Sequence, residues 1–421
     1  MSPETPTFQS LQCAVPGFAQ NLPRRKRVAR IWHWVFLTAT VVGVTVLSVL
    51  LYNIVDSAFG YVAVQSRVDP RTLAVDGVPL EALPREQLVE VLRAHVSAGV
   101  MRRLEQERPF AERSREEVYA LVLERVVQPQ VVETWSLTES LLHRAAIQKE
   151  VAGRFPGATL EFRRWLTREF LTRPQSSRAE WAGVRTAILG SLWVILITVA
   201  VAFPLGVGAA IYLEEYAADT WYNRLIQTNI HNLAGVPSII YGMLGLAIFV
   251  RALEPLTSGA LFGLADPTTA NGRTVLSAGL TLGLLVLPLL IINAQEAIRA
   301  VPNSLREAAL ALGATKWQAV WHHVLPQALP GILTGTILAI SRALGETAPL
   351  VVVGASTFIV VDPSGPFSKF TTLPIQIYQW TSRPQEVFRH LAGAAILVLL
   401  ALLLTLNATA ILLRNRYQRR W

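Results

Sequence analysis

The sequence is poor in charge and contains almost no cysteine. Asp, Glu, Lys and Arg make up 16% of its 421 residues, whereas apolar side chains make up 52%, a balance that soluble globular domains do not have. The single cysteine, Cys13, excludes disulfides and cysteine metal sites within one chain. The chain also lacks a G-x4-G-K-[ST] phosphate loop, the common ATP-binding motif. These absences leave a membrane protein as the first expectation.

The sequence contains several long runs without charged residues. Five runs reach the roughly 20 residues with which a helix crosses a hydrocarbon core about 30 Å thick. They are residues 31–55, 186–213, 225–250, 274–295 and 391–413. One further run, 327–361, which is the fifth in chain order, is interrupted only by Arg342 and Glu346. The sequence therefore predicts an all-α membrane protein with six transmembrane helices, the first retained because no small-residue cleavage site follows it.

The two ends of the chain indicate its orientation. "RRKRVAR" at 24–30 has five basic residues and "RNRYQRRW" at 414–421 has four. Basic flanks stay in the cytoplasm, and six helices return the chain to its starting side, so we expect both termini to be cytoplasmic. The expected segments are a cytoplasmic amino-terminal tail (1–30), transmembrane helix 1 (31–55), an extracytoplasmic insert (56–184), transmembrane helices 2–6 (185–413) and a cytoplasmic carboxy-terminal tail (414–421).

The insert differs from the rest of the chain in its balanced charge, with 18 basic and 18 acidic residues. The net charge of +9 therefore lies in the membrane portion and its flanks, which indicates contact with anionic membrane lipid and not with nucleic acid. Segments such as "REQLVEVLRAHVSAGVMRRLEQE" have apolar residues at helical spacing, which predicts an α-helical domain. "LEFRRWLTREFLTRP", residues 160–174, is expected either to lie along the membrane surface as an amphipathic helix or to pack as an ordinary helix. The insert has no metal-ligand spacing or nucleophile motif, so the sequence assigns it no chemistry.

Residues 306–332, "REAALALGATKWQAVWHHVLPQALPGI", join the fourth and fifth runs. We expect a short helix that starts near Glu307 and ends at Gly313, with Leu325-Pro326 closing the segment before the next span. A helix too short to cross the bilayer is expected to dock on a partner at the cytoplasmic face.

The spacing E-A-A-x3-G, followed by L-P, resembles the EAA loop of binding-protein-dependent ABC importer permeases. The loop departs from that family at His323, where isoleucine is usual. The resemblance implies that residues 296–330 dock on an ATPase subunit and couple its closure to the membrane helices. The residues it assigns to coupling are Glu307, Ala308, Ala309, Gly313, Leu325 and Pro326.

Three further segments narrow this resemblance. "NLAGVPSIIYG" (232–242), "SRALGETAPL" (341–350) and "FTTLPIQIYQW" (370–380) are similar to segments of phosphate transport system permeases, particularly those of the PstA type. The resemblance implies an inner-membrane protein with a MetI-like permease fold and no enzymatic activity or cofactor of its own. The implied partners are a PstC-like second permease subunit, a PstB-like ATPase dimer that binds ATP-Mg, and a PstS-like periplasmic phosphate-binding protein.

The charges in the fifth run are candidates for the substrate pathway. Arg342 and Glu346 are four residues apart, so they share one helix face and can pair. Because charges at membrane depth are costly, they face a protein interior or a water-filled path. One interpretation is a structural pair that locks helices together. The other is that Arg342 binds an oxyanion through its planar guanidinium while Glu346 neutralises it when the path is empty. Further pathway candidates are Thr347, Ser238 and Tyr241.

Other functions remain as alternatives. The same architecture would serve another oxyanion, such as molybdate, sulfate or phosphonate. A membrane enzyme would need a nucleophile and base or a metal set within the spans, and His231 is the only histidine well inside one. A receptor whose insert senses a signal is the third class, and the EAA-like loop argues against it.

Overall fold

The computed structural model describes residues 22–75, 77–264, 272–355 and 358–417. Within these ranges, five helices are long and apolar enough to cross a membrane, or six if one bent pair counts as a single span. The chain divides after residue 54 into two compact units. Cys13 and most of the expected tail 1–30 lie outside the described residues, as do residues 418–421.

The first unit contains most of helix α2 (Leu22–Ala58). This helix starts at Leu22, so the basic flank "RRKRVAR" forms its first turns. Lysine and arginine are good helix formers, and a basic flank therefore does not stop a helix. The run predicted as the first span lies within α2, which passes the length and hydropathy requirements for crossing a membrane.

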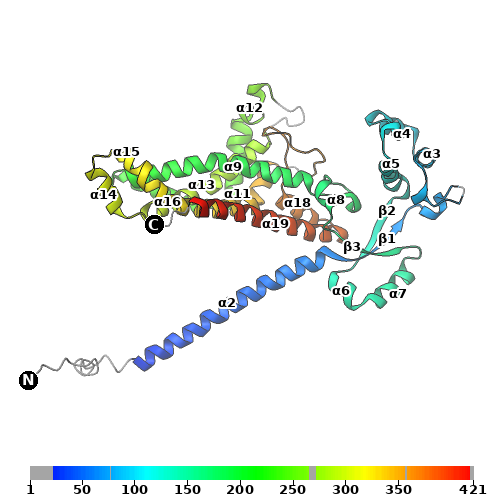
Figure 1. Cartoon of the computed structure of the whole chain (residues 1–421), viewed down its shortest axis with the longest axis horizontal. Coiled ribbons are helices and arrows are strands. Elements are labelled where there is room, and N and C mark those ends of the chain that lie inside the picture. Colours follow the sequence, from blue (N-terminus) through cyan, green and yellow to red (C-terminus); the bar gives the residue numbers. More distant parts are fainter. Residues whose placement is uncertain (1–21, 76, 265–271, 356–357, 418–421) are drawn as a thin grey trace, which may run out of the picture. The chain divides into compact units, whose positions relative to one another are not determined.

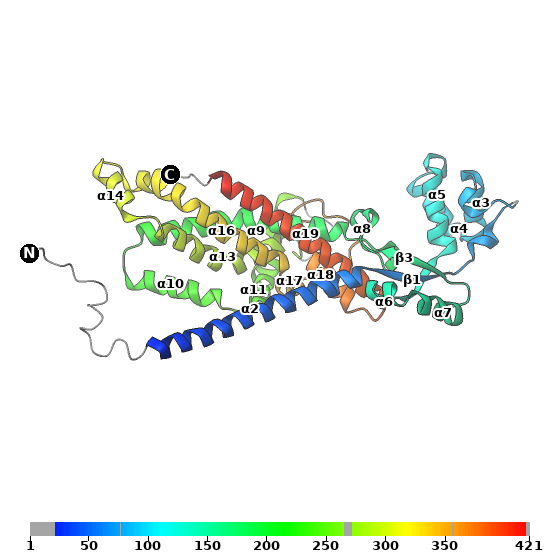
Figure 2. The same cartoon turned by 60° about the horizontal axis from the view of Figure 1, so that its bottom comes forward.

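Four long helices form the centre of the second unit (Figures 1 and 2). They are α9 (Arg185–Ile211), α13 (Val275–Arg299), α16 (Leu325–Gly345) and α19 (Glu386–Tyr417). Helix α13 packs against both α9 and α16, and α16 also contacts α19. A Cβ at Gly279 would lie 2.6 Å from the side chain of Ile197, so the missing side chain permits the close approach typical of membrane helices. The predicted all-α membrane region is confirmed.

The third predicted span is broken into two helices. Helices α10 (Trp221–Ala234) and α11 (Ser238–Gly245, continued by the wide turn η7, Leu246–Ala252) are bent by 106°. The hydroxyl of Tyr241 donates a 2.7 Å hydrogen bond to the carbonyl of Leu233, across the break. Pro237 lies between the helices and has no N–H to continue a ladder. The run 225–250, predicted as one span, is therefore sharply bent.

The fifth span differs from the prediction of one helix over 327–361. The helical stretch runs from Lys316 to Gly345, and a separate short helix, α17 (Ala348–Val353), follows. Pro349 explains the break, because its ring would clash with the carbonyl four residues earlier, that of Gly345. Arg342 thus lies in the last turn of α16, not in the middle of a span.

The two broken spans meet. Helix α11 packs against α17, and a Cβ at Gly242 would lie 2.6 Å from Cα of Pro349. Tyr241, Ala343, Leu344 and Leu350 belong to one buried cluster. The breaks after α10 and after α16 therefore belong to neighbouring parts of the bundle.

The insert contains a three-stranded antiparallel sheet, which corrects the prediction that it is entirely helical. Strand β1 (Phe59–Ser66) lies between β2 (Pro129–Thr134) and β3 (Thr159–Arg164), with Val62 opposite both Thr134 and Glu161. The segment 160–174, expected as one amphipathic helix, begins in strand β3 and becomes helical only at Arg168–Thr172. The alternation T-L-E-F-R of β3 is the period-two pattern of a strand, but its partner is almost 100 residues away.

Helices make up the rest of the insert. Residues 70–127 form a lobe around a core that includes Leu83, Leu88, Leu92 and Val118. Its helices are α3 (Arg85–His95), α4 (Ala98–Glu107) and α5 (Arg115–Val122). Between β2 and the first long membrane helix of this unit lie α6 (Leu137–Leu142), α7 (Arg144–Arg154) and α8 (Arg168–Thr172).

The insert is attached to one end of the membrane helices through α18 (Leu373–Thr381) and the segment before α9 (Figure 2). The buried Gln376 side-chain amide donates a 2.8 Å hydrogen bond to the carbonyl of Gly183. Arg185 forms a 2.8 Å ion pair with Asp362. These contacts lie at the end of the bundle opposite the loop 296–330 (Figure 1).

Candidate functional site

The EAA-like loop folds into two short helices, α14 (Asn303–Ala311) and α15 (Lys316–Ala319). Gly313 ends α14 with φ of 84°, a conformation that favours glycine. Its N–H donates to the carbonyl of Leu310, and the N–H of Ala314 donates to the carbonyl of Ala309. These are the two bonds of a Schellman cap. The spacing between the second alanine of E-A-A and the glycine thus matches the backbone hydrogen bonds of this cap.

The loop presents part of its motif to solvent. Glu307 and Ala308 are exposed, whereas Ala309 is buried. The neighbouring Leu312 is 90% exposed, and the rings of Trp317 and Trp321 stack with centroids 5.3 Å apart while about half exposed. An exposed apolar surface beside a carboxylate suits a protein partner.

Leu325-Pro326, expected to close this segment before the next span, lies where the loop passes into the membrane helix. Leu325 begins α16 and Pro326 lies in its first turn, where its missing N–H is tolerated. The preceding turn, η10 (Val320–Val324), is wider than an α-helix, and such turns accommodate the proline without ending the helix. The coupling residues predicted from the sequence therefore fall on two elements, with Leu325 and Pro326 at the base of a membrane helix.

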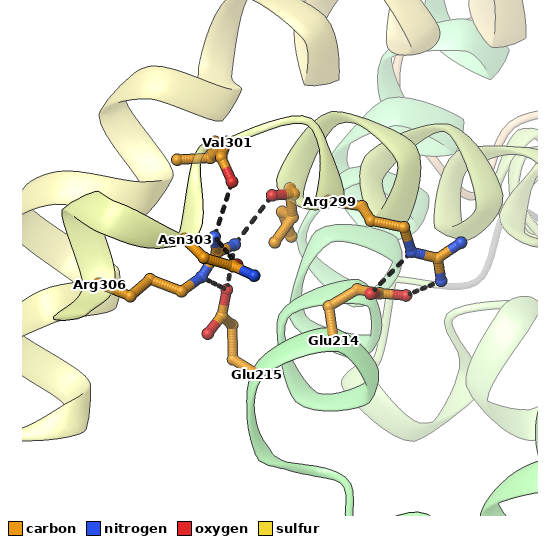
Figure 3. Close-up of polar contacts among 7 residues, drawn as sticks. Glu214, Glu215, Arg299, Val301, Asn303 and Arg306 are labelled. Carbon is orange, nitrogen blue, oxygen red and sulfur yellow. Dashed lines mark hydrogen bonds and ion pairs between the residues drawn. The ribbon is translucent and has the colours of Figure 1, made fainter.

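Two ion pairs that were not predicted from the sequence lie at the base of the loop (Figure 3). Glu214 and Glu215 lie on η6 (Tyr212–Tyr216), a wide turn that continues α9. Glu214 pairs with Arg299 at 2.6 Å, and Glu215 pairs with Arg306 of α14 at 2.8 Å. One indication of these pairs was present in the sequence, because the predicted spans put the opposite charges on the same side of the membrane.

Arg342 and Glu346 form a looser pair. Their nearest nitrogen and oxygen are 3.5 Å apart, and the side chains are 46% and 18% exposed. Arg342 lies in the last helical turn, where the helix dipole favours a cation. Glu346 and Thr347 occupy the break between α16 and α17. The structure therefore places three of the predicted pathway residues together at one break.

The other two predicted pathway residues lie on the neighbouring broken span. Ser238 is the first residue of α11 and is partly buried. Tyr241 is 6% exposed and donates its hydroxyl hydrogen to Leu233. This contact holds the bend between α10 and α11. Within the described ranges, no group of three or more His, Cys, Asp or Glu is placed to hold a metal.

Comparisons with known proteins agree on one family. A family model described as binding-protein-dependent transport system inner membrane component matches residues 202–421. The chain is 32% identical over 257 residues to the probable ABC transporter permease protein YqgI of Bacillus subtilis strain 168, covering 58% of this chain and 82% of that protein. It is 36% identical over 240 residues to the phosphate transport system permease protein PstA 1 of Mycobacterium tuberculosis H37Rv, covering 56% and 71%.

Among solved structures, the inward-facing MetNI methionine ABC transporter aligns with a TM-score of 0.44 at 18% identity. That alignment covers 58% of this chain and 100% of the other. The family model begins at residue 202, after the insert.

Proposed function

The chain belongs to the family of binding-protein-dependent transport system inner membrane components, and from this premise we propose that it is the permease subunit of an ATP-driven phosphate importer. Relatives named as phosphate transport system permeases support the substrate, including those of Mycobacterium tuberculosis and Yersinia pestis. In this role the chain forms half of the translocation path and carries no ATPase activity itself.

The position of Arg342 is the observation that supports phosphate as the substrate. This guanidinium lies at the end of a membrane helix and is 46% exposed in the single chain. Because an arginine that faced lipid would cost several kcal/mol, its exposed side belongs against a second subunit or a water-filled path. A guanidinium there offers a planar fork that matches phosphate oxygens and replaces their water.

The pairing with Glu346 supports release as well as binding. A carboxylate next to Arg342 competes with an incoming anion and neutralises the arginine when the path is empty. The separation of 3.5 Å is longer than a strong charge-assisted hydrogen bond of about 2.7 to 2.9 Å. The pair therefore holds Arg342 weakly enough for an anion to replace Glu346.

The partners follow from the family and from what this chain lacks. No phosphate loop occurs in the sequence, so ATP-Mg is bound by a separate ATPase dimer, which docks on Glu307, Ala308 and the exposed apolar side chains around Gly313. A second permease subunit completes the path, and a periplasmic phosphate-binding protein delivers the ligand. The chain then lies in the inner membrane with both termini in the cytoplasm.

Gentle solubilisation followed by purification tests this proposal. We expect an ATPase and a second permease subunit to co-purify. The complex, reconstituted in vesicles with the binding protein, is expected to take up labelled phosphate when ATP is supplied. Recovery of the chain alone from every preparation would contradict the importer assignment. Stronger competition by molybdate, sulfate or phosphonate than by phosphate would replace the substrate with another oxyanion.

A further inference from the structure

Arg306 has an unusually complete set of contacts at the base of the coupling loop. Its Nε and one terminal nitrogen donate to Glu215 at 2.9 and 2.8 Å, and that nitrogen also donates to the carbonyl of Ile298 at 2.9 Å. The other terminal nitrogen donates to the carbonyl of Val301 at 2.7 Å and to the side chain of Asn303 at 3.1 Å. All five N–H donors of the guanidinium are therefore used.

These contacts join three elements (Figure 3). Arg306 belongs to α14, Glu215 belongs to the turn that continues α9, and Ile298 lies in the last turn of α13. Arg306 turns inward although Glu307, the next residue, is exposed, because successive helical residues are rotated by about 100°. The docking surface and the internal contact thus occupy adjacent residues of one short helix.

We propose that Arg306 and Glu215 are positioning residues that fix the coupling helix to α9 and α13, so that a displacement of α14 by the ATPase moves both membrane helices. The side chains of this pair are 19% and 7% exposed, and a buried pair that loses one partner leaves an uncompensated charge. The connection therefore does not yield easily when the loop is pushed. This inference rests on the proposed ATP-driven transport.

The neighbouring pair Arg299–Glu214 provides a matched control. It joins the same turn to α13, but Arg299 is 59% exposed, and the contacts drawn for its guanidinium in Figure 3 lead to Glu214. Glu214 is mostly buried, but water reaches Arg299, and this screening weakens the pair. The structure therefore assigns transmission to the Arg306–Glu215 pair and not to the Arg299–Glu214 pair.

The test compares Arg306→Lys with Arg299→Lys in the purified complex with its ATPase and binding protein. Lysine keeps the charge but has three donors and no planar fork. For Arg306→Lys we expect the ATPase to remain bound and ATP to be hydrolysed, while phosphate transported per ATP falls by about fivefold or more, a factor that corresponds to roughly 1 kcal/mol. For Arg299→Lys the ratio is expected to stay at the wild-type value.

An unchanged ratio in Arg306→Lys would overturn the inference. If that variant loses the ATPase subunit, Glu215→Asp is measured instead, since it keeps the charge and shortens the reach. Loss of the ATPase in both variants would also overturn it, because the pair would then serve only to fold the loop. Wild-type complex measured alongside separates the two proposals: absent phosphate uptake contradicts the substrate, and the ratio is then measured with the anion that the wild type transports.

Discussion

Two arginine–glutamate pairs, one at the coupling loop and one at the end of a membrane helix, have the same chemistry and opposite environments. Arg306 and Glu215 are 2.8 Å apart and mostly buried, whereas Arg342 and Glu346 are 3.5 Å apart and Arg342 is about half exposed. In the first pair every guanidinium donor already has an acceptor within the chain. In the second, Arg342 makes one long hydrogen bond within the described part of the chain, to Glu346.

The difference in used guanidinium donors distinguishes an arginine that holds the structure from one that can bind a ligand. An arginine whose donors are all used has nothing to offer an anion, and it can only fix the elements that it joins. An arginine with one long contact keeps its fork free for a planar or tetrahedral oxyanion. The number of donors already used therefore distinguishes the two roles better than the presence of an ion pair does.

Replacing Arg342 by glutamine would break the comparison most directly. If Arg342 binds the anion, its loss removes charged hydrogen bonds that contribute roughly 1.5 to 3 kcal/mol, so the initial rate of uptake falls about tenfold to a hundredfold. ATP hydrolysis and assembly with the ATPase are expected to persist. The measurement is labelled phosphate uptake into vesicles, with ATPase activity recorded in the same samples. Undiminished uptake by Arg342→Gln would return this pair to a structural role.

Replacing Glu346 by glutamine sharpens the comparison from the other side. Removal of the competing carboxylate leaves Arg342 unneutralised, so we expect tighter retention of the anion and slower release. The maximal uptake rate should fall by about fivefold, while half-saturation shifts to lower phosphate, because a difference of roughly 1 kcal/mol acts on the bound state. Substrate saturation curves of wild type and Glu346→Gln measure both effects. A higher half-saturation value would contradict competition between Glu346 and the anion.

The comparison also explains what the sequence could predict. Arg342 and Glu346 are four residues apart and lie in an uncharged run, so helical spacing alone indicated the pair. Glu215 and Arg306 are 91 positions apart, and only the packing of α9 against α13 brings them together. The spans were predictable because lipid leaves a crossing segment little choice but a helix. The sheet of the insert was not, because β1 finds its partners far along the chain and follows a membrane helix directly.

Gly313 tests whether the coupling helix depends on its cap as well as on Arg306. Alanine there would have to adopt φ of 84°, which costs roughly 1 kcal/mol or more for a residue with a Cβ. We expect Gly313→Ala to lower the fraction of ATPase that remains bound after purification by about threefold to fivefold. Gly208→Ala in α9 is the control, because a Cβ there meets no atom within 4 Å and its φ is not positive. If both variants retained the same fraction of ATPase, the cap at Gly313 would have no part in coupling.

The Arg108–Glu117 pair of the insert is exposed on both sides, and changing it is expected to have the smallest effect. Glu117 accepts a 2.9 Å hydrogen bond from Arg108 with both side chains about half exposed. The backbone N–H of Ser114, together with Arg108, holds the pKa of Glu117 below its ordinary value. A depressed carboxyl pKa contributes stability at neutral pH that is lost as the pH falls below about 4.3, the ordinary pKa of glutamate, through the lower folded-state pKa.

Amide hydrogen exchange in α5, corrected for the intrinsic effect of pH, measures this contribution. Glu117→Gln is expected to reduce protection of α5 slightly at neutral pH and to make it less dependent on pH in the acidic range. Phosphate uptake should remain at the wild-type rate, because exposed pairs contribute little to stability. The pair also lies far in sequence from Arg306–Glu215 and Arg342–Glu346. A loss of uptake in Glu117→Gln, at unchanged protection, would mean that an exposed pair of the insert takes part in transport, and burial would no longer rank the pairs of this protein.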